Sequence, residues 1–156
     1  MFSLPPIRSA QVKIYPENDY SMYFDGCSKG NPGPSGCGSV IFSSGKEIWG
    51  SSIFVGERET NNVAEYNGLL LGLKKAIEMN IKRLIVYGDS LLVIKQMNNQ
   101  YKVSSERLLP LFNEAQELKS EFDMILFVRV YRTQNKRADE LSNMGLLLHK
   151  QSRVSL

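Results

Sequence analysis

Two acidic residues of this chain directly follow apolar runs. Asp25 comes after the aromatic run 20–24 and is followed by a segment rich in glycine and proline, and Asp89 comes after the apolar run 84–87 and Gly88. Such runs predict buried strands that lead into tight loops. A carboxylate at such a point is held rigidly beside backbone N–H groups, so it can bind a hard metal ion and a polymer backbone. Simpler interpretations exist, because Asp-Gly can start a turn and Asp89 can cap a helix.

Two further acids, Glu65 and Asp139, lie in predicted helices. We expect a helix from the candidate N-cap Asn62 to about Met79, with Glu65 three residues after the cap. Glu65 heads a line of small residues, which predicts close packing on a sheet with Glu65 at the buried end. Asp139 lies near the start of another helix, and taken alone it is most simply a solvated residue. The small residues are Gly68, Gly72 and Ala76, and the apolar stripe is Val63, Tyr66, Leu70, Leu73 and Ile77.

The elements around these acids predict an α/β fold. A first strand and a hairpin give three antiparallel strands, and two later strands alternate with helices. The continuous apolar run 84–87 predicts a strand covered on both faces. A strand–helix–strand crossover places its strands in parallel, so the order predicts a five-stranded mixed sheet flanked by helices. We expect strands at 20–25, within 36–54 around a turn at 44–46, at 84–87 and at 124–131, and helices at 62–79, 91–97, from Ser104 or Ser105, and at 135–148.

Size and composition indicate one soluble domain. The chain has 156 residues, of which 42% are hydrophobic, and no apolar run approaches the ~20 residues that span a bilayer. The net charge of +3 is compatible with a polyanionic ligand but does not demonstrate one. Cys27, Cys37 and the distant His149 cannot form a four-ligand zinc site, and two reduced thiols are favoured over a disulfide. We divide the chain into an N-terminal arm at 1–19, a domain at 20–148 and a frayed basic tail at 149–156.

Four fragments of the sequence together resemble type 1 ribonuclease H. They are Tyr-Phe-Asp-Gly-Cys-Ser-Lys-Gly-Asn-Pro-Gly at 23–33, Thr-Asn-Asn-Val-Ala-Glu-Tyr at 60–66, Tyr-Gly-Asp-Ser at 87–90 and Asn-Lys-Arg-Ala-Asp-Glu-Leu-Ser at 135–142. The fragments occur in the order of that family and extend over residues 20 to about 148. The resemblance implies a ribonuclease H-like fold in which Asp25, Glu65, Asp89 and Asp139 converge.

The resemblance also implies the reaction, hydrolysis of the RNA strand of an RNA–DNA hybrid to 5′-phosphate and 3′-hydroxyl ends. Four converging carboxylates repel one another unless divalent cations neutralise them, and oxygen ligands select hard ions such as Mg²⁺, for which Mn²⁺ can substitute. Two such ions can activate a water and stabilise a leaving alkoxide. By resemblance, Asp25 and Asp89 hold the water-activating ion, Asp25 and Glu65 hold the leaving-group ion, and Asp139 completes the first ion's shell.

Substrate contacts are implied by the same match. Selectivity for RNA must come from the 2′-hydroxyl, and a glycine-rich loop lets main-chain groups approach the strand closely. The family histidine before the last acid is missing, and Arg132 is the candidate for its product-release role. A loop arginine such as Arg58 is also explained by simple solvation. The implied contacts are Ser28, Gly30 and Asn31 to the 2′-hydroxyl, Asn61 and Asn62 in the minor groove, Arg58 and Thr60 on a DNA phosphate, and Ser90 and Gln96 beside Asp89.

Two other functional classes remain as alternatives. One is a catalytically silent module that binds hybrids, which would normally have lost an acid. The other is the ribonuclease H domain of a reverse-transcriptase-like assembly. A nucleotide kinase or GTPase is disfavoured because the glycine-rich loop lacks the Gly-Lys-Ser/Thr ending. We expect a monomer without a membrane partner or small-molecule cofactor. We expect an intracellular location, cytoplasmic or nuclear. Targeting to an organelle is a further alternative, because residues 1–16 contain no acidic residue, as is typical of transit peptides.

Overall fold

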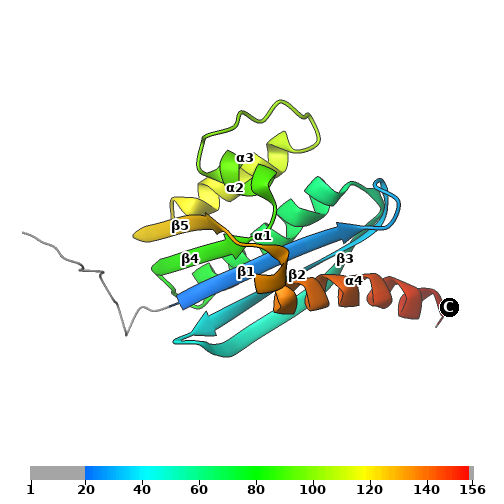
Figure 1. The fold of residues 1–156 in the computed structure, drawn as a ribbon, viewed down its shortest axis with the longest axis horizontal. Coiled ribbons are helices and arrows are strands. Elements are labelled where there is room, and N and C mark those ends of the chain that lie inside the picture. Colours follow the sequence, from blue (N-terminus) through cyan, green and yellow to red (C-terminus); the bar gives the residue numbers. More distant parts are fainter. Residues whose placement is uncertain (1–19, 155–156) are drawn as a thin grey trace, which may run out of the picture.

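A five-stranded mixed sheet forms the centre of the fold, with the strand order β3-β2-β1-β4-β5 (Figure 1). The computed structural model describes residues 20–154, so the predicted arm 1–19 lies outside the described residues. β1 pairs antiparallel with β2 and parallel with β4, and β4 pairs parallel with β5. The elements are β1 Tyr20–Ser28, β2 Gly33–Ser43, β3 Lys46–Glu59, α1 Asn61–Glu78, β4 Arg83–Gly88, α2 Leu91–Met97, α3 Leu109–Lys119, β5 Met124–Arg129, the 3₁₀ turn η2 Arg132–Gln134, and α4 Lys136–Val154.

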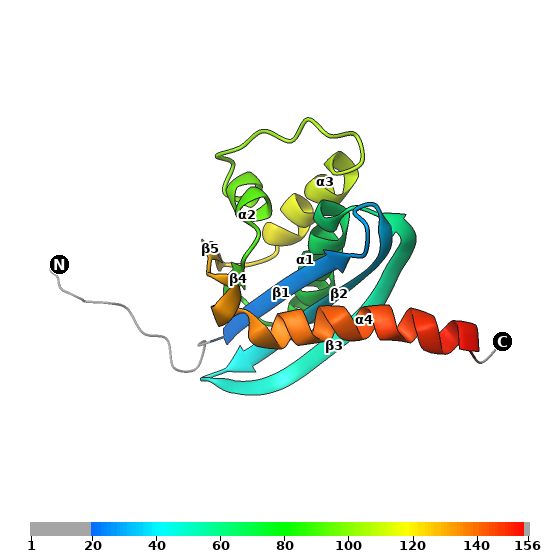
Figure 2. The ribbon, with the colours of Figure 1, turned by 45° about the vertical axis from the view of Figure 1, so that its right-hand side comes forward.

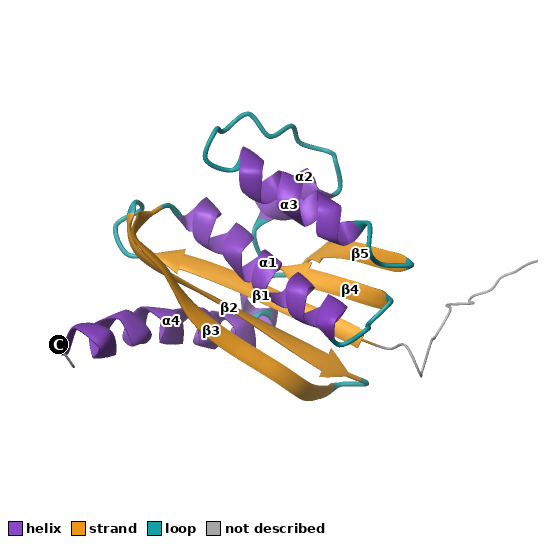
Figure 3. Ribbon diagram, turned by 180° about the vertical axis from the view of Figure 1, so that it is seen from behind, coloured by secondary structure: helices purple, strands orange, loops and turns teal. Residues whose placement is uncertain are grey.

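The helices form two unequal layers on the sheet. α4 crosses one face, where it packs on β1, β2 and β3 (Figure 2). The other three helices lie on the opposite face, where α1 packs on β1 and β2 and α3 packs on α1 (Figure 3). The main core lies under α1, with Met22, Phe24, Tyr66, Leu69 and Leu73 fully buried. The predicted mixed sheet flanked by helices is therefore confirmed.

The small-residue line of α1 packs against the sheet as predicted. A Cβ atom on Gly68 would lie 2.6 Å from the carbonyl oxygen of Asp25, which is too close for any larger residue without a shift. α1 therefore approaches β1 at backbone distance. Glu65, one turn earlier, is buried with 8% of its surface exposed.

β4 is covered less completely than the sequence predicted. Leu84 and Val86 are buried under the helices, but Ile85 and Tyr87, which point to the other face, are only partly buried. Among the described residues, the main packing of α4 is on β1, β2 and β3 rather than on β4 and β5. Leu126 of β5, the register partner of Ile85, is therefore 51% exposed.

Several predicted boundaries need correction. α1 is capped by Thr60 rather than Asn62, because the Thr60 hydroxyl accepts a hydrogen bond from the Val63 N–H at 3.2 Å and Asn62 already lies inside the helix. α3 begins at Leu109 and not at Ser104 or Ser105, because the Ser105 hydroxyl accepts from the Leu108 N–H in a turn before the helix. Pro110 then lies in the first turn, where its missing N–H costs nothing. α4 continues past the predicted end at 148 to Val154.

Candidate active site

Asp25 lies inside β1 rather than at its end. The antiparallel pairing with β2 continues through Asp25↔Gly38 to Ser28↔Ser35, so the strand runs three residues further than predicted. The parallel pairing with β4 stops at Phe24↔Gly88. Asp89 is the next residue after Gly88, so the two carboxylates follow the last paired residues of neighbouring parallel strands. Sequence spacing alone could not show this adjacency.

Glu65 of α1 lies next to Asp25 of β1 because the residue that follows Asp25 is a glycine. The backbone of Gly26 lies against the Ala64 carbonyl group and the Glu65 N–H, and a side chain at position 26 would occupy the same space. α1 can therefore approach β1 closely at the point where the helix carries Glu65 and the strand carries Asp25. Asp25 and Glu65 are 5% and 8% exposed respectively, so both lie at the bottom of the site.

Asp139 is supplied by the first turn of α4, whose start is attached to β1. The buried Asn135 donates its side-chain N–H to the carbonyl oxygen of Phe24 at 3.0 Å, and its own carbonyl oxygen accepts from the Asp139 N–H at 3.0 Å. The residue that positions α4 is thus bonded to the residue before Asp25. Asn135 was quoted in the sequence motif, but its positioning role was missed because it depends on a contact 111 residues away.

The four predicted acids are brought together in one cleft. Carboxylate oxygens of Asp25, Glu65 and Asp89 all lie within 4.8 Å of one another. Asp139 lines the same cleft and contributes to the raised pKa of Asp25. The cleft has a volume of about 550 Å³ and is lined by Asp25, Gly26, Cys27, Ser28, Asn61, Glu65, Asp89, Arg129, Arg132 and Asp139.

The buried acids favour their protonated forms in the absence of cations. Burial raises the pKa of Asp25 from 3.8 to about 7, and the negative charge of Asp89 and the neighbouring Asp139 side chain add to this. Burial also raises the pKa of Glu65 well above its usual value, followed by the charges of Asp25 and Asp89. Both shifts have the same cause, since desolvation and like charges disfavour an ionised carboxylate.

The donor set fits a divalent cation. Glu65 Oε1 is buried and has no hydrogen-bond partner among the described residues, although a buried carboxylate oxygen normally has one. Closely spaced carboxylate oxygens are the ligands of hard cations such as Mg²⁺, Mn²⁺ and Ca²⁺. A cation in this cleft would provide the missing partner and offset both the desolvation and the repulsion that raise the pKa values of Asp25 and Glu65.

The loop after β1 is connected to the start of α1 by hydrogen bonds. Asn61 accepts from the Ser28 N–H at 2.8 Å through its side-chain oxygen, and its own N–H donates to the Asn31 side-chain oxygen at 2.9 Å. Gly30 and Asn31 both have positive φ angles, 102° and 37°, which form the tight turn. Ser28 and Asn61 line the acid cleft from this side. The structure thus brings Ser28, Gly30, Asn31 and Asn61 together beside the acids.

Not every predicted substrate contact lies in the cleft. Gln96 is only 3% exposed, and its side-chain oxygen accepts from the Tyr66 hydroxyl at 2.7 Å, so it faces the core and is corrected to an internal residue. Ser90 caps α2, accepting from the Val93 N–H, which also excludes the N-cap interpretation of Asp89. The lining residues do not include Arg58, Thr60 or Asn62, all of which lie near the start of α1.

The cleft also contains residues that the sequence analysis did not select. Arg129, the last residue of β5, lines the cleft together with the predicted Arg132. Cys27 lines it as well, but its thiol contacts the Ser142 carbonyl oxygen on the α4 side of the sheet. Cys37 is fully buried, and both cysteines are free, as favoured over a disulfide. Nothing in the sequence marked Arg129 as a site residue, because a single arginine at the end of a strand is common.

Comparison with known proteins identifies the family. Residues 23–145 match the family model described as Reverse transcriptase-like. The chain is 42% identical over 120 residues to the bifunctional protein Rv2228c of Mycobacterium tuberculosis, covering 76% of this chain and 33% of that protein. It thus spans about a third of the length of that curated relative.

Solved structures agree with this match. The N-terminal RNase H domain of Rv2228c superposes with a TM-score of 0.81 at 39% identity, covering 86% of this chain and 97% of that chain. RNase H1 from the archaeon Halobacterium salinarum has a TM-score of 0.78 at 36% identity over 81% of this chain and 96% of its own. LC11-RNase H1, solved in complex with an RNA/DNA hybrid, has a TM-score of 0.76 at 35% identity over 81% of this chain and 96% of its own. The chain belongs to the ribonuclease H family.

Proposed function

We propose that this chain is an endoribonuclease that hydrolyses the RNA strand of RNA–DNA hybrids. The observation that carries the proposal is the convergence of the Asp25, Glu65 and Asp89 carboxylates within 4.8 Å at the bottom of an open cleft. Membership of the ribonuclease H family and the similarity to a relative solved with an RNA/DNA hybrid support the choice of substrate. The products are 5′-phosphate and 3′-hydroxyl ends.

The cleft has the ligands for two divalent ions, and Mg²⁺ is the proposed ion, with Mn²⁺ as a substitute. Asp25 and Asp89 would hold the ion on the side of the attacking water, Asp25 and Glu65 would hold the ion on the leaving-group side, and Asp139 would complete the shell of the first ion. Paired ions of this kind activate a water and stabilise the leaving alkoxide. The raised pKa values of Asp25 and Glu65 support this assignment, because burial and like charges disfavour the ionised carboxylates and a bound cation would offset both effects.

The loop that ends β1 distinguishes RNA from DNA. Hydrogen bonds join Ser28, Asn31 and Asn61 beside the acids, and Gly30 lies in the same loop, so the main-chain and amide groups of this loop can face the 2′-hydroxyl that only RNA carries. Asn62 reaches the minor groove, and Arg58 and Thr60 contact a phosphate of the DNA strand. Arg58 is exposed, as this role requires.

Arg132 takes part in product release in place of the missing histidine. It lies in the cleft, at the first position of the 3₁₀ turn η2, and is exposed. It forms no ion pair with another residue of the described part of the chain. Because the Arg132 side chain forms no such ion pair, it is free to bind the cleaved phosphate and to move with it as the product leaves.

The silent-module alternative has less support, because all four acids are retained and line the cleft. We propose a monomer that needs no small-molecule cofactor and acts inside the cell, in the cytoplasm or nucleus unless residues 1–19 direct it to an organelle. No helix in the described part of the chain is long and apolar enough to cross a membrane.

The test is incubation of labelled RNA–DNA, RNA–RNA and DNA–DNA duplexes with the protein, with and without Mg²⁺. We expect cleavage of the RNA strand of the hybrid only when Mg²⁺ is present, with a 5′-phosphate on the downstream fragment. Hybrid binding with no cleavage in either Mg²⁺ or Mn²⁺ would favour the silent module instead.

A further inference from the structure

The acid cleft has an uneven distribution of charge on its two sides. The side formed by β1 and the start of α1 presents the neutral residues Cys27, Ser28 and Asn61. The opposite side, formed by the end of β5 and the segment before α4, presents Arg129 and Arg132. These two arginines are the cations among the described residues that line the cleft. A phosphodiester strand crossing the acids therefore meets hydrogen-bonding groups on one side and positive charge on the other.

Both the backbone and the guanidinium group of Arg129 have partners in the fold. Its backbone is paired with Gly88, the residue before Asp89, and the next residue, Val130, donates its N–H to the Gly88 carbonyl oxygen at 2.9 Å. Its guanidinium carbon lies 5.5 Å from the centre of the Tyr131 ring. An aromatic face attracts a guanidinium through its electron-rich surface. Arg129 is thus oriented beside a catalytic acid before any substrate binds.

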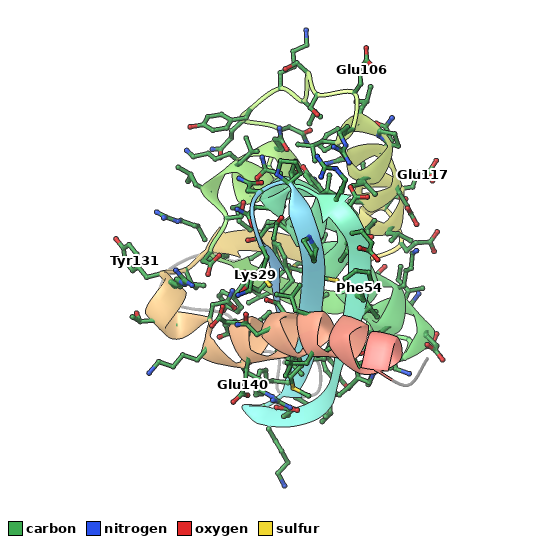
Figure 4. The ribbon with its side chains drawn as sticks, turned by 90° about the vertical axis from the view of Figure 1, so that its right-hand side faces the viewer. Lys29, Phe54, Glu106, Glu117, Tyr131 and Glu140 are labelled. Carbon is green, nitrogen blue, oxygen red and sulfur yellow. The ribbon has the colours of Figure 1, made fainter. Side chains whose placement is uncertain are left out.

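The side chain of Tyr131 is exposed, but its backbone is held by hydrogen bonds. The side chain is 70% exposed and projects outward from the segment that leads into α4 (Figure 4). Its N–H donates to the Gln134 side-chain oxygen at 3.0 Å, and its carbonyl oxygen accepts from the Gln134 N–H at 2.8 Å. An aromatic ring this exposed contributes little to the core, so its contact with Arg129 is its main described interaction outside η2.

The donors of Arg129 remain available to a ligand. Arg107 and Arg137 each form ion pairs with glutamates, but Arg129 forms none with another described residue. A planar guanidinium presents parallel N–H groups that match two oxygens of a phosphate. Arg132, which contacts no aromatic ring among the described residues, lacks this fixed orientation.

We propose that Arg129, oriented by Tyr131, binds a phosphate of the RNA strand next to the one that is cleaved. This inference rests on the proposed function and adds a fixed phosphate contact to it, separate from the release role of Arg132. Arg129 acts in binding, and Tyr131 is a positioning residue. The contact should therefore affect KM more than kcat, and it should contribute to the salt dependence of hybrid binding.

The test measures kcat and KM on a labelled RNA–DNA hybrid from about 25 to 200 mM KCl, since each phosphate contact contributes about 0.7–0.9 to the slope of log affinity against log salt. Arg129→Ala should raise KM about tenfold at low salt, change kcat less than twofold and make the slope shallower by about 1. Arg129→Lys should keep the slope but not the full affinity, because lysine keeps the charge and loses the planar donor pair. Tyr131→Ala should raise KM about threefold with little change of slope, and Tyr131→Phe should rescue it because the ring remains.

Lys46→Ala is the matched control, because it removes one positive charge at the β2–β3 turn, among residues that do not line the cleft. If Arg129→Ala changes KM and slope no more than Lys46→Ala, or lowers kcat alone, the inference is overturned while the proposed function stands. If the wild-type protein does not cleave the hybrid at all, the proposed function fails first. Melting temperatures of the variants confirm that each is folded.

Discussion

The backbone of Gly26 in β1 lies directly against the backbone of Ala64 in α1, with no space for a side chain between them. This contact brings Asp25 and Glu65, the residues next to each of them, to the same point of the cleft. The two acids therefore meet because a strand and a helix approach at backbone distance, and not because long side chains reach across a gap.

Replacing Gly26 by alanine should separate the two acids. The added methyl group overlaps the Ala64 carbonyl group and the Glu65 N–H, so α1 must move, and overpacking of this kind costs about 1–3 kcal/mol of unfolding free energy. Hybrid cleavage should fall by more than about tenfold beyond the loss of folded protein. Urea unfolding and single-turnover cleavage check this. Gly50→Ala is the control, because the atoms nearest to an added Cβ are the side-chain ends of Glu47 and Leu141 at 3.2 and 3.4 Å, and the backbone oxygen of Ser39 is 3.8 Å away. Equal effects of both substitutions would contradict the role of Gly26.

Replacing Asp25 by asparagine should abolish cleavage but leave the fold intact. The substitution removes the one carboxylate proposed to hold both cations, so we expect at least a ~10³-fold loss of rate in Mg²⁺. The unfolding free energy in EDTA at pH 8 should stay level or rise, because a buried charge next to Asp89 is removed. Near-normal turnover of this variant would overturn the site assignment.

The metal-free protein should become less stable as the pH rises from about 4 to 7. Asp25 has a pKa of 3.8 when unfolded and about 7 when folded, so in this window the folded state binds a proton that the unfolded state has lost. At about 1.4 kcal/mol for each pH unit, the contribution of Asp25 is at most roughly 4 kcal/mol, and it is fully lost above pH 7. Urea unfolding in EDTA at several pH values measures this slope. In the Asp25→Asn variant, the decrease of the unfolding free energy with pH should be smaller, and the contribution of Glu65 to that decrease should remain. A profile that rises over this range in the wild-type protein would contradict the prediction.

Thr60 and Asn62 provide a matched pair for the cap of α1. Thr60→Ala removes the hydrogen bond from the Val63 N–H and should cost about 0.5–2 kcal/mol of stability. Asn62→Ala should change stability by less than about 0.5 kcal/mol, because Asn62 lies within the helix and alanine favours helices. Thermal unfolding of both variants compares them directly. A larger loss for Asn62→Ala would restore the cap predicted from the sequence.

Arg132→Ala should slow multiple-turnover cleavage more than single-turnover cleavage, by roughly three- to tenfold in the ratio of the two rates. The reason is that Arg132 is proposed to assist the departure of the product and not the chemical step. Rapid-quench experiments with enzyme in excess, followed by steady-state assays, separate the two rates. Identical reductions in both would remove the release role.

Local patterns in the sequence were sufficient to predict the elements and the acids, but not their boundaries or contacts. The stripe of α1, the strand before Asp89 and the hairpin of β2 and β3 were predicted correctly, because each depends on the pattern of neighbouring residues, although the turn at 44–46 is one residue shorter than predicted because Lys46 already pairs with Ser43. The end of β1 was predicted three residues too early because glycine and proline normally end a strand. Here the antiparallel pairing with β2 overrides that local preference.

The site could be predicted as a set of residues but not as a geometry. The motifs indicated Asp25, Glu65, Asp89 and Asp139, and the structure places all four in one cleft. Gln96 was assigned to the substrate because it is close to Asp89 in sequence, but its helical position turns it into the core. The pairing of Arg129 with Gly88 and the hydrogen bond from Asn135 to Phe24 each join residues more than 40 positions apart, which no local pattern could indicate.

Because the acids come from β1, α1, the end of β4 and α4, the cleft cannot exist until segments from residue 25 to residue 139 have folded together. The proposed binding of a divalent cation would consequently be a measure of completed folding. A partly folded molecule has the same carboxylates in its sequence but lacks the cleft, so the proposed nuclease activity would belong to the folded chain alone.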